Sequence, residues 1–124
     1  MKERMMKMKR ILVVDDASFM RATLRMMLER NEYKVIGEAV NGMDAVVKYA
    51  ELKPDIVTMD ITMPEMSGIE AVRAIKVLDP DARIVMISAM GQETMVRESI
   101  MAGAEGFLVK PFQEGDVIKV LSKM

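Results

Sequence analysis

Five short apolar runs constrain the fold of this chain more than any other feature of its sequence. They lie near residues 10–14, 34–39, 55–59, 83–87 and 105–109, and each is continuous and rich in β-branched residues rather than alternating with polar ones. Runs of this kind are typical of strands buried on both faces of a parallel sheet. The sequence therefore predicts five such strands.

Helical patterns separate the apolar runs. The clearest stripe has the spacing i, i+3, i+4, i+7, i+8 and consists of Met20, Thr23, Leu24, Met27 and Leu28. Ser67 is placed to cap the third helix, and Gly103 to end the fourth. Five strand–helix alternations predict an α/β fold of type (βα)₅, a three-layer sandwich with helices on both faces of the sheet. We expect a single domain over 9–124, preceded by a flexible N-terminal tail over 1–8.

Polar side chains gather where the apolar runs end. Asp15 and Asp16 follow the first run, Asp60 follows the third, Ser88 follows the fourth and Lys110 ends the fifth. In an open parallel sheet the carboxyl ends of the strands meet at one edge, which is where ligands bind. Three carboxylates, a hydroxyl and an ammonium group at that edge predict a site for a divalent cation and a phosphoryl group.

Each of these residues also has an ordinary structural explanation. One Asp of the pair could cap the following helix, Asp60 could be a loop carboxylate, Ser88 a strand-end hydroxyl and Lys110 a surface lysine. The set argues otherwise, because three clustered carboxylates are unfavourable unless a cation neutralises them. Beside such a cation, Asp60 could attack phosphorus, with Ser88 and Lys110 contacting the transferred oxygens.

Composition narrows the chemistry further. The chain has no Cys and no His, which excludes thiol and histidine catalysis, histidine metal ligands and phosphohistidine. A metal must then be held by oxygen atoms, which favours Mg²⁺, Ca²⁺ or Mn²⁺. The net charge of −1 gives no field that attracts nucleic acid, and no apolar run is long enough to enter a membrane.

Methionine is unusually frequent, with 16 residues. Because methionine is a flexible filler of irregular gaps, we expect most of these side chains to lie in the core. The alternative is a recognition surface lined with methionine.

Several segments together resemble the receiver domain of two-component response regulators, and most closely the single-domain chemotaxis regulators. The resemblance runs from about residue 9 to 123. It rests on five segments, which are Asp15-Asp16, Met59-Asp60 with Met63-Pro64, Ser88-Ala89, Ala102-Gly103-Ala104 with Gly106-Phe107, and Lys110-Pro111-Phe112. It implies a flavodoxin-like parallel sheet with strand order 2-1-3-4-5.

The resemblance also implies roles for the residues of the site. Asp60 would accept the phosphoryl group of a phosphohistidine. Asp16, Asp60 and the main-chain carbonyl of Thr62 would bind Mg²⁺ directly, with Asp15 acting partly through water, and Mn²⁺ could substitute. Ser88 would move toward the phosphoryl group, and Lys110 would pair with both the phosphoryl group and the carboxylate of Asp60. Phe107 would turn inward as Ser88 moves.

The same resemblance implies a cytoplasmic, monomeric binding module rather than an enzyme. Its donor would be a histidine kinase of the CheA type, its target a flagellar motor switch or archaellum adaptor protein, and a phosphatase would end the signal. Thr62 and Met90 stand where Asn and Glu are common in chemotaxis regulators, and Phe107 stands where Tyr is frequent. These departures bear on the lifetime of the acyl phosphate and on partner contacts.

Three alternative functions fit the sequence less well. A relay receiver would pass its phosphoryl group to another protein's histidine. A phosphatase of the haloacid dehalogenase type would need a second Asp two residues after the nucleophile, where this chain has Thr62. A flavodoxin-like electron carrier would need a phosphate loop rich in Gly, Ser and Thr after the first strand, where this chain has Asp15-Asp16.

The sequence also predicts a cis peptide bond between Lys110 and Pro111, because a tight turn must aim the Lys110 side chain at the edge of the sheet.

Overall fold

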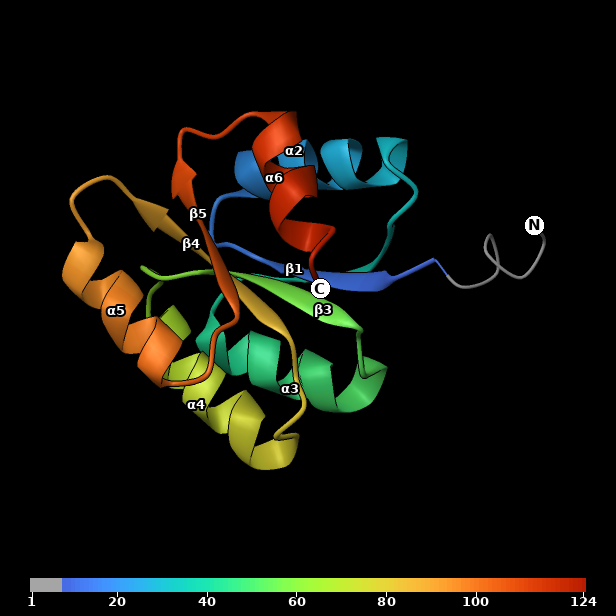
Figure 1. Ribbon diagram of the computed structural model, residues 1–124. Coiled ribbons are helices and arrows are strands. Elements are labelled where there is room, and N and C mark those ends of the chain that lie inside the picture. The colour runs from blue at the N-terminus through green and yellow to red at the C-terminus, as the bar shows by residue number, and fades with distance from the viewer. Residues whose placement is uncertain (1–7) are drawn as a thin grey trace.

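The computed structural model describes residues 8–124 (Figure 1). Its five parallel strands are β1 (Arg10–Val14), β2 (Lys34–Ala39), β3 (Ile56–Asp60), β4 (Ile84–Ala89) and β5 (Gly106–Lys110). They form one sheet in the order β2-β1-β3-β4-β5. The predicted fold class and strand order are therefore confirmed.

The strand boundaries differ slightly from those expected. The last three strands begin and end one or two residues later than predicted. Asp60 and Lys110 are consequently the last residues of β3 and β5, and Ser88 is the second-last residue of β4. Only Asp15 and Asp16 follow their strand. Main-chain hydrogen bonding of the sheet therefore fixes three of the candidate residues more firmly than a loop would.

Helices alternate with the strands along the chain. They are α2 (Ser18–Arg30), α3 (Gly42–Leu52), α4 (Gly68–Leu78), α5 (Glu93–Met101) and α6 (Glu114–Leu121). Figure 1 shows α3, α4 and α5 on one face of the sheet and α2 and α6 on the other. None of the helices within 8–124 is long and apolar enough to cross a membrane.

The sheet separates two hydrophobic cores. In β1, Leu12 and Val14 pack toward α3 and α4, whereas Ile11 and Val13 pack toward α2 and α6. All four side chains are fully buried, as expected for a strand covered on both faces. The continuous apolar runs are thus explained by burial on two sides.

The structure also confirms the local sequence signals for the ends of two helices and for one turn. The Ser67 hydroxyl accepts a hydrogen bond from the main-chain N–H of Glu70, and the Glu70 carboxylate accepts one from the main-chain N–H of Ser67. Together they form a capping box at the start of α4. Gly103, just past α5, has a φ of 117°, a conformation that favours glycine. The Lys110–Pro111 bond is cis, as predicted.

The expectation for methionine holds only in part. Within residues 8–124, the buried methionines are Met59, Met63 and Met86. Others are largely exposed, namely Met8, Met26, Met43, Met90, Met95 and Met101. Apart from Met8 and Met90, which lie outside the strands and helices, these exposed methionines lie on helices. The expected tail over 1–8 lies outside the described residues except for Met8.

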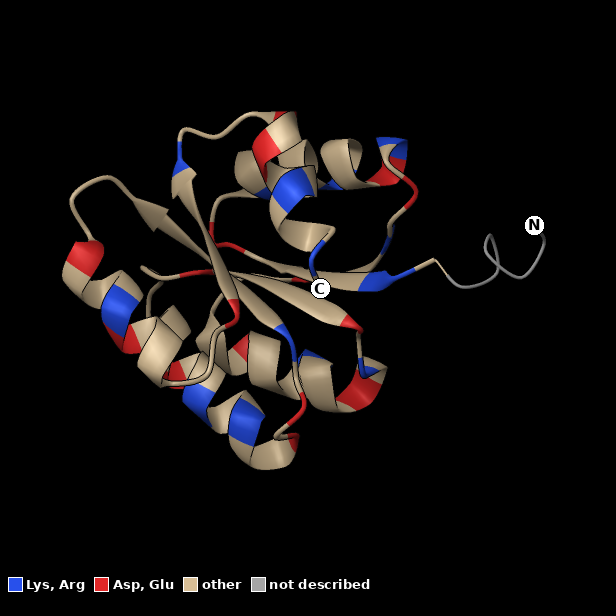
Figure 2. Ribbon diagram, viewed as in Figure 1, with Lys and Arg blue, Asp and Glu red and all other residues tan. Residues whose placement is uncertain are grey.

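Basic and acidic residues both occur along the helices (Figure 2). Glu38 on β2 forms ion pairs with Arg21 and Arg25 of α2, both at 2.9 Å. These pairs fasten α2 across the edge of the sheet, so that the loop leading from β1 into α2 is held at both ends.

Candidate functional site

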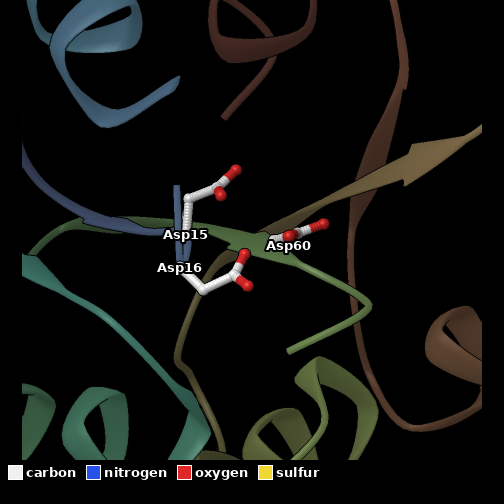
Figure 3. Close-up of side chains that lie close together, drawn as sticks. All are labelled: Asp15, Asp16 and Asp60. Carbon is white, nitrogen blue, oxygen red and sulfur yellow. The ribbon is translucent and has the colours of Figure 1, made fainter. Parts of the chain in front are cut away.

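Three carboxylates meet at the carboxyl edge of the sheet. One oxygen each of Asp15, Asp16 and Asp60 lies within 4.8 Å of the other two. Figure 3 shows the side chains of Asp15 and Asp16, which follow β1, beside that of Asp60 at the end of β3. Asp15 is fully buried and Asp60 is 7% exposed, whereas Asp16 is open to solvent. The cluster predicted from the sequence is therefore present, with one ligand accessible from outside.

The Lys110 ammonium group lies between two of these carboxylates. Its Nζ is 3.2 Å from Oδ2 of Asp15 and 3.6 Å from Oδ1 of Asp60. Pairing with Asp60 was expected, but the closer contact with Asp15 was not. One cation thus serves two buried carboxylates, and the third, Asp16, adds further negative charge.

The electrostatics of Asp60 follow from this crowding. Burial, followed by the repulsion of Asp15, raises the pKa of Asp60 to about 6, although Lys110 acts in the opposite direction. The carboxylate is thus costly to keep charged, and a divalent cation would relieve that cost. The donors are all oxygen atoms and one is exposed, so they fit Mg²⁺, which keeps several of its water ligands.

Main-chain contacts hold the acid loop in place. The Asp15 carboxylate accepts a hydrogen bond of 2.9 Å from the N–H of Ala17. The Arg21 guanidinium donates to the Asp15 carbonyl oxygen at 2.7 Å and is itself fixed by Glu38. Nothing in the sequence pattern singled out Arg21, because its role depends on α2 folding back over the loop.

Gly68 allows α4 to begin directly against the end of β3. A Cβ atom at this position would lie 2.1 Å from the carbonyl oxygen of Asp60 and 2.9 Å from the Cα of Ile61. The Gly68 N–H donates to the Ile61 carbonyl at 2.8 Å. Both close neighbours are main-chain atoms, so a side chain here would displace the segment that carries Asp60.

Ser88 and Phe107 are close to the site but do not contact it in this structure. Ser88 is buried, and its hydroxyl donates to the Leu108 carbonyl over a long 3.5 Å. Phe107 is 47% exposed on β5. Both line a surface cavity of about 340 Å³, together with Met90, Val96 and Val109. The ring therefore has space beside it that it does not fill.

The side chains of Thr62 and Gln92 connect two loops beside Asp60. Thr62 is exposed just beyond β3, and its hydroxyl accepts a hydrogen bond of 2.9 Å from Nε2 of Gln92. Oε1 of Gln92 accepts another, of 2.6 Å, from the N–H of Ala89. Thr62 was expected near the metal through its carbonyl group, but the link to Gln92 was not anticipated.

Comparisons with known proteins agree with this geometry. Residues 11–122 match the response regulator receiver domain. The chemotaxis protein CheY of Thermotoga maritima is 58% identical over 94% of this chain and 97% of its own length. The CheY of Bacillus subtilis is 55% identical over 92% and 95%.

Solved structures show the same fold. A chain in the CheX–CheY–BeF₃–Mg complex of Borrelia burgdorferi has a TM-score of 0.89 and 37% identity, covering 93% of this chain and 87% of that one. The arrangement of acidic, hydroxyl and ammonium groups at the sheet edge accords with that relationship. The chain belongs to the family of response regulator receiver domains, and the two relatives named above are chemotaxis proteins of the CheY type.

Proposed function

We propose that this receiver takes a phosphoryl group from a histidine kinase of the CheA type onto Asp60. The observation that carries the proposal is the position of Asp60, nearly buried at the end of β3 with two carboxylates and the Lys110 ammonium around it. A carboxylate oxygen of Asp60 attacks phosphorus, the bond from phosphorus to the imidazole nitrogen breaks, and the leaving imidazole takes up a proton.

Each side chain around Asp60 has its own role in the proposed phosphoryl transfer. Asp15, Asp16, Asp60 and the carbonyl of Thr62 would hold Mg²⁺ or Mn²⁺, which neutralises charge on the phosphoryl oxygens. Lys110 exchanges its contact with Asp60 for one with a phosphoryl oxygen. The Ser88 hydroxyl leaves Leu108 and donates to another. Incubation with acetyl phosphate and Mg²⁺, followed by peptide mass mapping, tests this directly, because the added phosphoryl group should be found on Asp60.

We infer that the output is binding to a motility protein, either a flagellar motor switch or an archaellum adaptor. The support is the family relationship to CheY and the exposed apolar face of α5 and β5, to which Met95, Met101 and Phe107 contribute. The Borrelia relative was solved with CheX and beryllofluoride, and we propose that a phosphatase also acts on this chain. We propose that the chain acts in the cytoplasm as a monomeric regulator, with residues 9–124 forming the single receiver domain.

Mg²⁺ is expected to raise the melting temperature of the unphosphorylated protein. A cation relieves the repulsion among Asp15, Asp16 and Asp60, and it stabilises the folded state by about 2.7 kcal/mol at roughly 100 times its Kd. Asp16→Asn should remove most of this gain. Asp81→Asn, which alters an exposed carboxylate before β4, should keep it. Calorimetric melts with and without Mg²⁺ measure the effect, and a wild-type melt indifferent to Mg²⁺ would count against the site.

Phe107→Ala is expected to leave labelling of Asp60 intact but to remove the gain in partner affinity on activation. The ring is half exposed beside an unfilled cavity, so it can differ between two states, and only such differences change affinity. Val109→Ala removes apolar area from the same strand without removing the ring. Calorimetry with the target, with and without beryllofluoride, gives the affinity ratio. An unchanged ratio for Phe107→Ala would defeat the switch assignment.

A further inference from the structure

The Gln92 carboxamide bridges three segments at the carboxyl edge of the sheet. Its Oε1 accepts from the N–H of Ala89, the last residue of β4, at 2.6 Å. Its Nε2 donates to the Thr62 hydroxyl at 2.9 Å and lies 3.6 Å from the sulfur of Met95 in α5. The first two contacts connect the end of β4 with the loop that follows Asp60.

The backbone is shaped to make this bridge. Gly91 has a φ of 87°, which turns the chain back so that Gln92 faces Ala89. Gln92 is also the N-cap residue of α5, yet its side chain makes no capping hydrogen bond. The Ala89 N–H can only donate, which fixes Oε1 toward it and leaves Nε2 for Thr62. The side chain is thus committed to the bridge rather than to the helix.

The bridge opposes the rearrangement that phosphorylation requires. Ser88 precedes Ala89, so a shift of the Ser88 main chain that brings its hydroxyl from Leu108 toward a phosphoryl group also moves the Ala89 N–H that Gln92 holds. Thr62 lies two residues after Asp60, in the loop that follows β3. A side chain fastened to both loops holds their separation in the unphosphorylated arrangement.

We propose that Gln92 is a positioning residue that holds the receiver in its unphosphorylated conformation, and that the bridge breaks when the β4–α5 loop moves toward Asp60. This inference rests on the proposed phosphorylation of Asp60. Its consequence is a shift in population. A ligand that selects the switched conformation binds more weakly while the bridge keeps that conformation rare.

Gln92→Leu keeps the size of the side chain and removes both hydrogen bonds. We expect it to tighten the binding of beryllofluoride, measured in the presence of Mg²⁺, by about 2- to 10-fold, the range that corresponds to one net hydrogen bond. A merely structural residue would give the opposite result, because loosening the site weakens binding. The matched control is Gln113→Leu, which alters the chain's other glutamine, exposed before α6, and should leave the affinity unchanged.

Thr62→Val supplies a second variant, because it removes the hydroxyl and keeps the main-chain carbonyl. If the bridge acts as a unit, Gln92→Leu should have little further effect on beryllofluoride affinity in a Thr62→Val background. Additive effects of the two substitutions would contradict a shared bridge.

Hydrogen exchange tests the bridge without any phosphoryl mimic. The Ala89 amide should exchange slowly in the wild type and several-fold faster in Gln92→Leu, as followed by NMR. Equal exchange rates in the wild type and Gln92→Leu, or beryllofluoride binding to Gln92→Leu that is no tighter than to the wild type, would overturn this inference. The proposed function would still stand in that case, provided that the wild type binds beryllofluoride. A wild type that neither binds beryllofluoride nor is labelled would overturn both.

Discussion

Asp60→Asn is expected to abolish labelling by acetyl phosphate and by a phosphohistidine donor. An amide cannot act as the nucleophile, so no acyl phosphate can form at this position. Intact-protein mass spectrometry after incubation with Mg²⁺ and donor measures the effect. Asp81→Asn, at an exposed carboxylate before β4, should be labelled like the wild type. Residual labelling mapped to Asp15 or Asp16 would show that the acceptor was assigned wrongly.

The same substitution should stabilise the fold in a manner that depends on pH. The pKa of Asp60 is raised to about 6 from 3.8, chiefly by burial and then by Asp15, so the folded state binds this proton more tightly than the unfolded state. The contribution of Asp60 to the free energy of unfolding therefore falls as the pH rises through this window. Asparagine carries no such charge.

We thus expect Asp60→Asn to be more stable than the wild type by about 1–2 kcal/mol above pH 7, a value reduced for the water that reaches the site. The difference should shrink toward zero near pH 4, where the wild-type side chain is also neutral. Urea unfolding at several pH values measures it. A stability difference that stayed constant with pH would mean that the repulsion is already relieved by other groups.

Gly68→Ala is expected to cost about 3 kcal/mol or more of stability and to weaken Mg²⁺ binding. The added Cβ would lie 2.1 Å from the Asp60 carbonyl oxygen and 2.9 Å from the Cα of Ile61, so α4 must move away from β3. Overpacking usually costs 1–3 kcal/mol, but here main-chain atoms, which cannot rotate aside, receive the methyl group. Displacement of this segment also moves Asp60 relative to Asp15 and Asp16.

Gly115→Ala is the matched control, because its Cβ would meet no atom within 4 Å. In the first turn of α6 the change should be neutral or stabilising by about 0.5–1 kcal/mol. Urea unfolding of both variants gives the comparison. Equal effects at the two glycines would show that the close approach of α4 to Asp60 can relax without cost.

The sequence predicted the elements of the fold well because each was encoded locally. Continuous apolar runs indicated strands that are covered on both faces of the sheet, and the stripe containing Leu24 and Leu28 indicated the buried face of α2. The cluster of Asp15, Asp16 and Asp60 followed from a topological rule, since parallel strands bring their carboxyl ends together.

What escaped prediction depends on how distant segments approach one another. Lys110 is 95 positions from Asp15, and their contact is set by the spacing of β5 and β1 across the sheet. The bridge from Gln92 to Thr62 spans 30 positions, and the need for glycine at Gly68 arises from main-chain atoms of Asp60 and Ile61. Neither the periodicity nor the composition of a sequence indicates contacts between residues so far apart in the chain. The locations of the methionines escaped prediction for another reason, because a flexible side chain suits both a core and a surface.

The distribution of methionine gives the molecule an uneven sensitivity to oxidants. Met90, Met95 and Met101 are 77%, 43% and 84% exposed, whereas Met59 and Met86 are fully buried. Peroxide converts accessible thioethers to polar sulfoxides, and the chain has no cysteine to react first. Oxidative damage therefore falls on exposed methionines, which include those at the rim of the cavity at Phe107, along α5 and on α2 and α3, while the buried methionines stay reduced. A cell under oxidative stress would then retain a folded receiver with an altered surface.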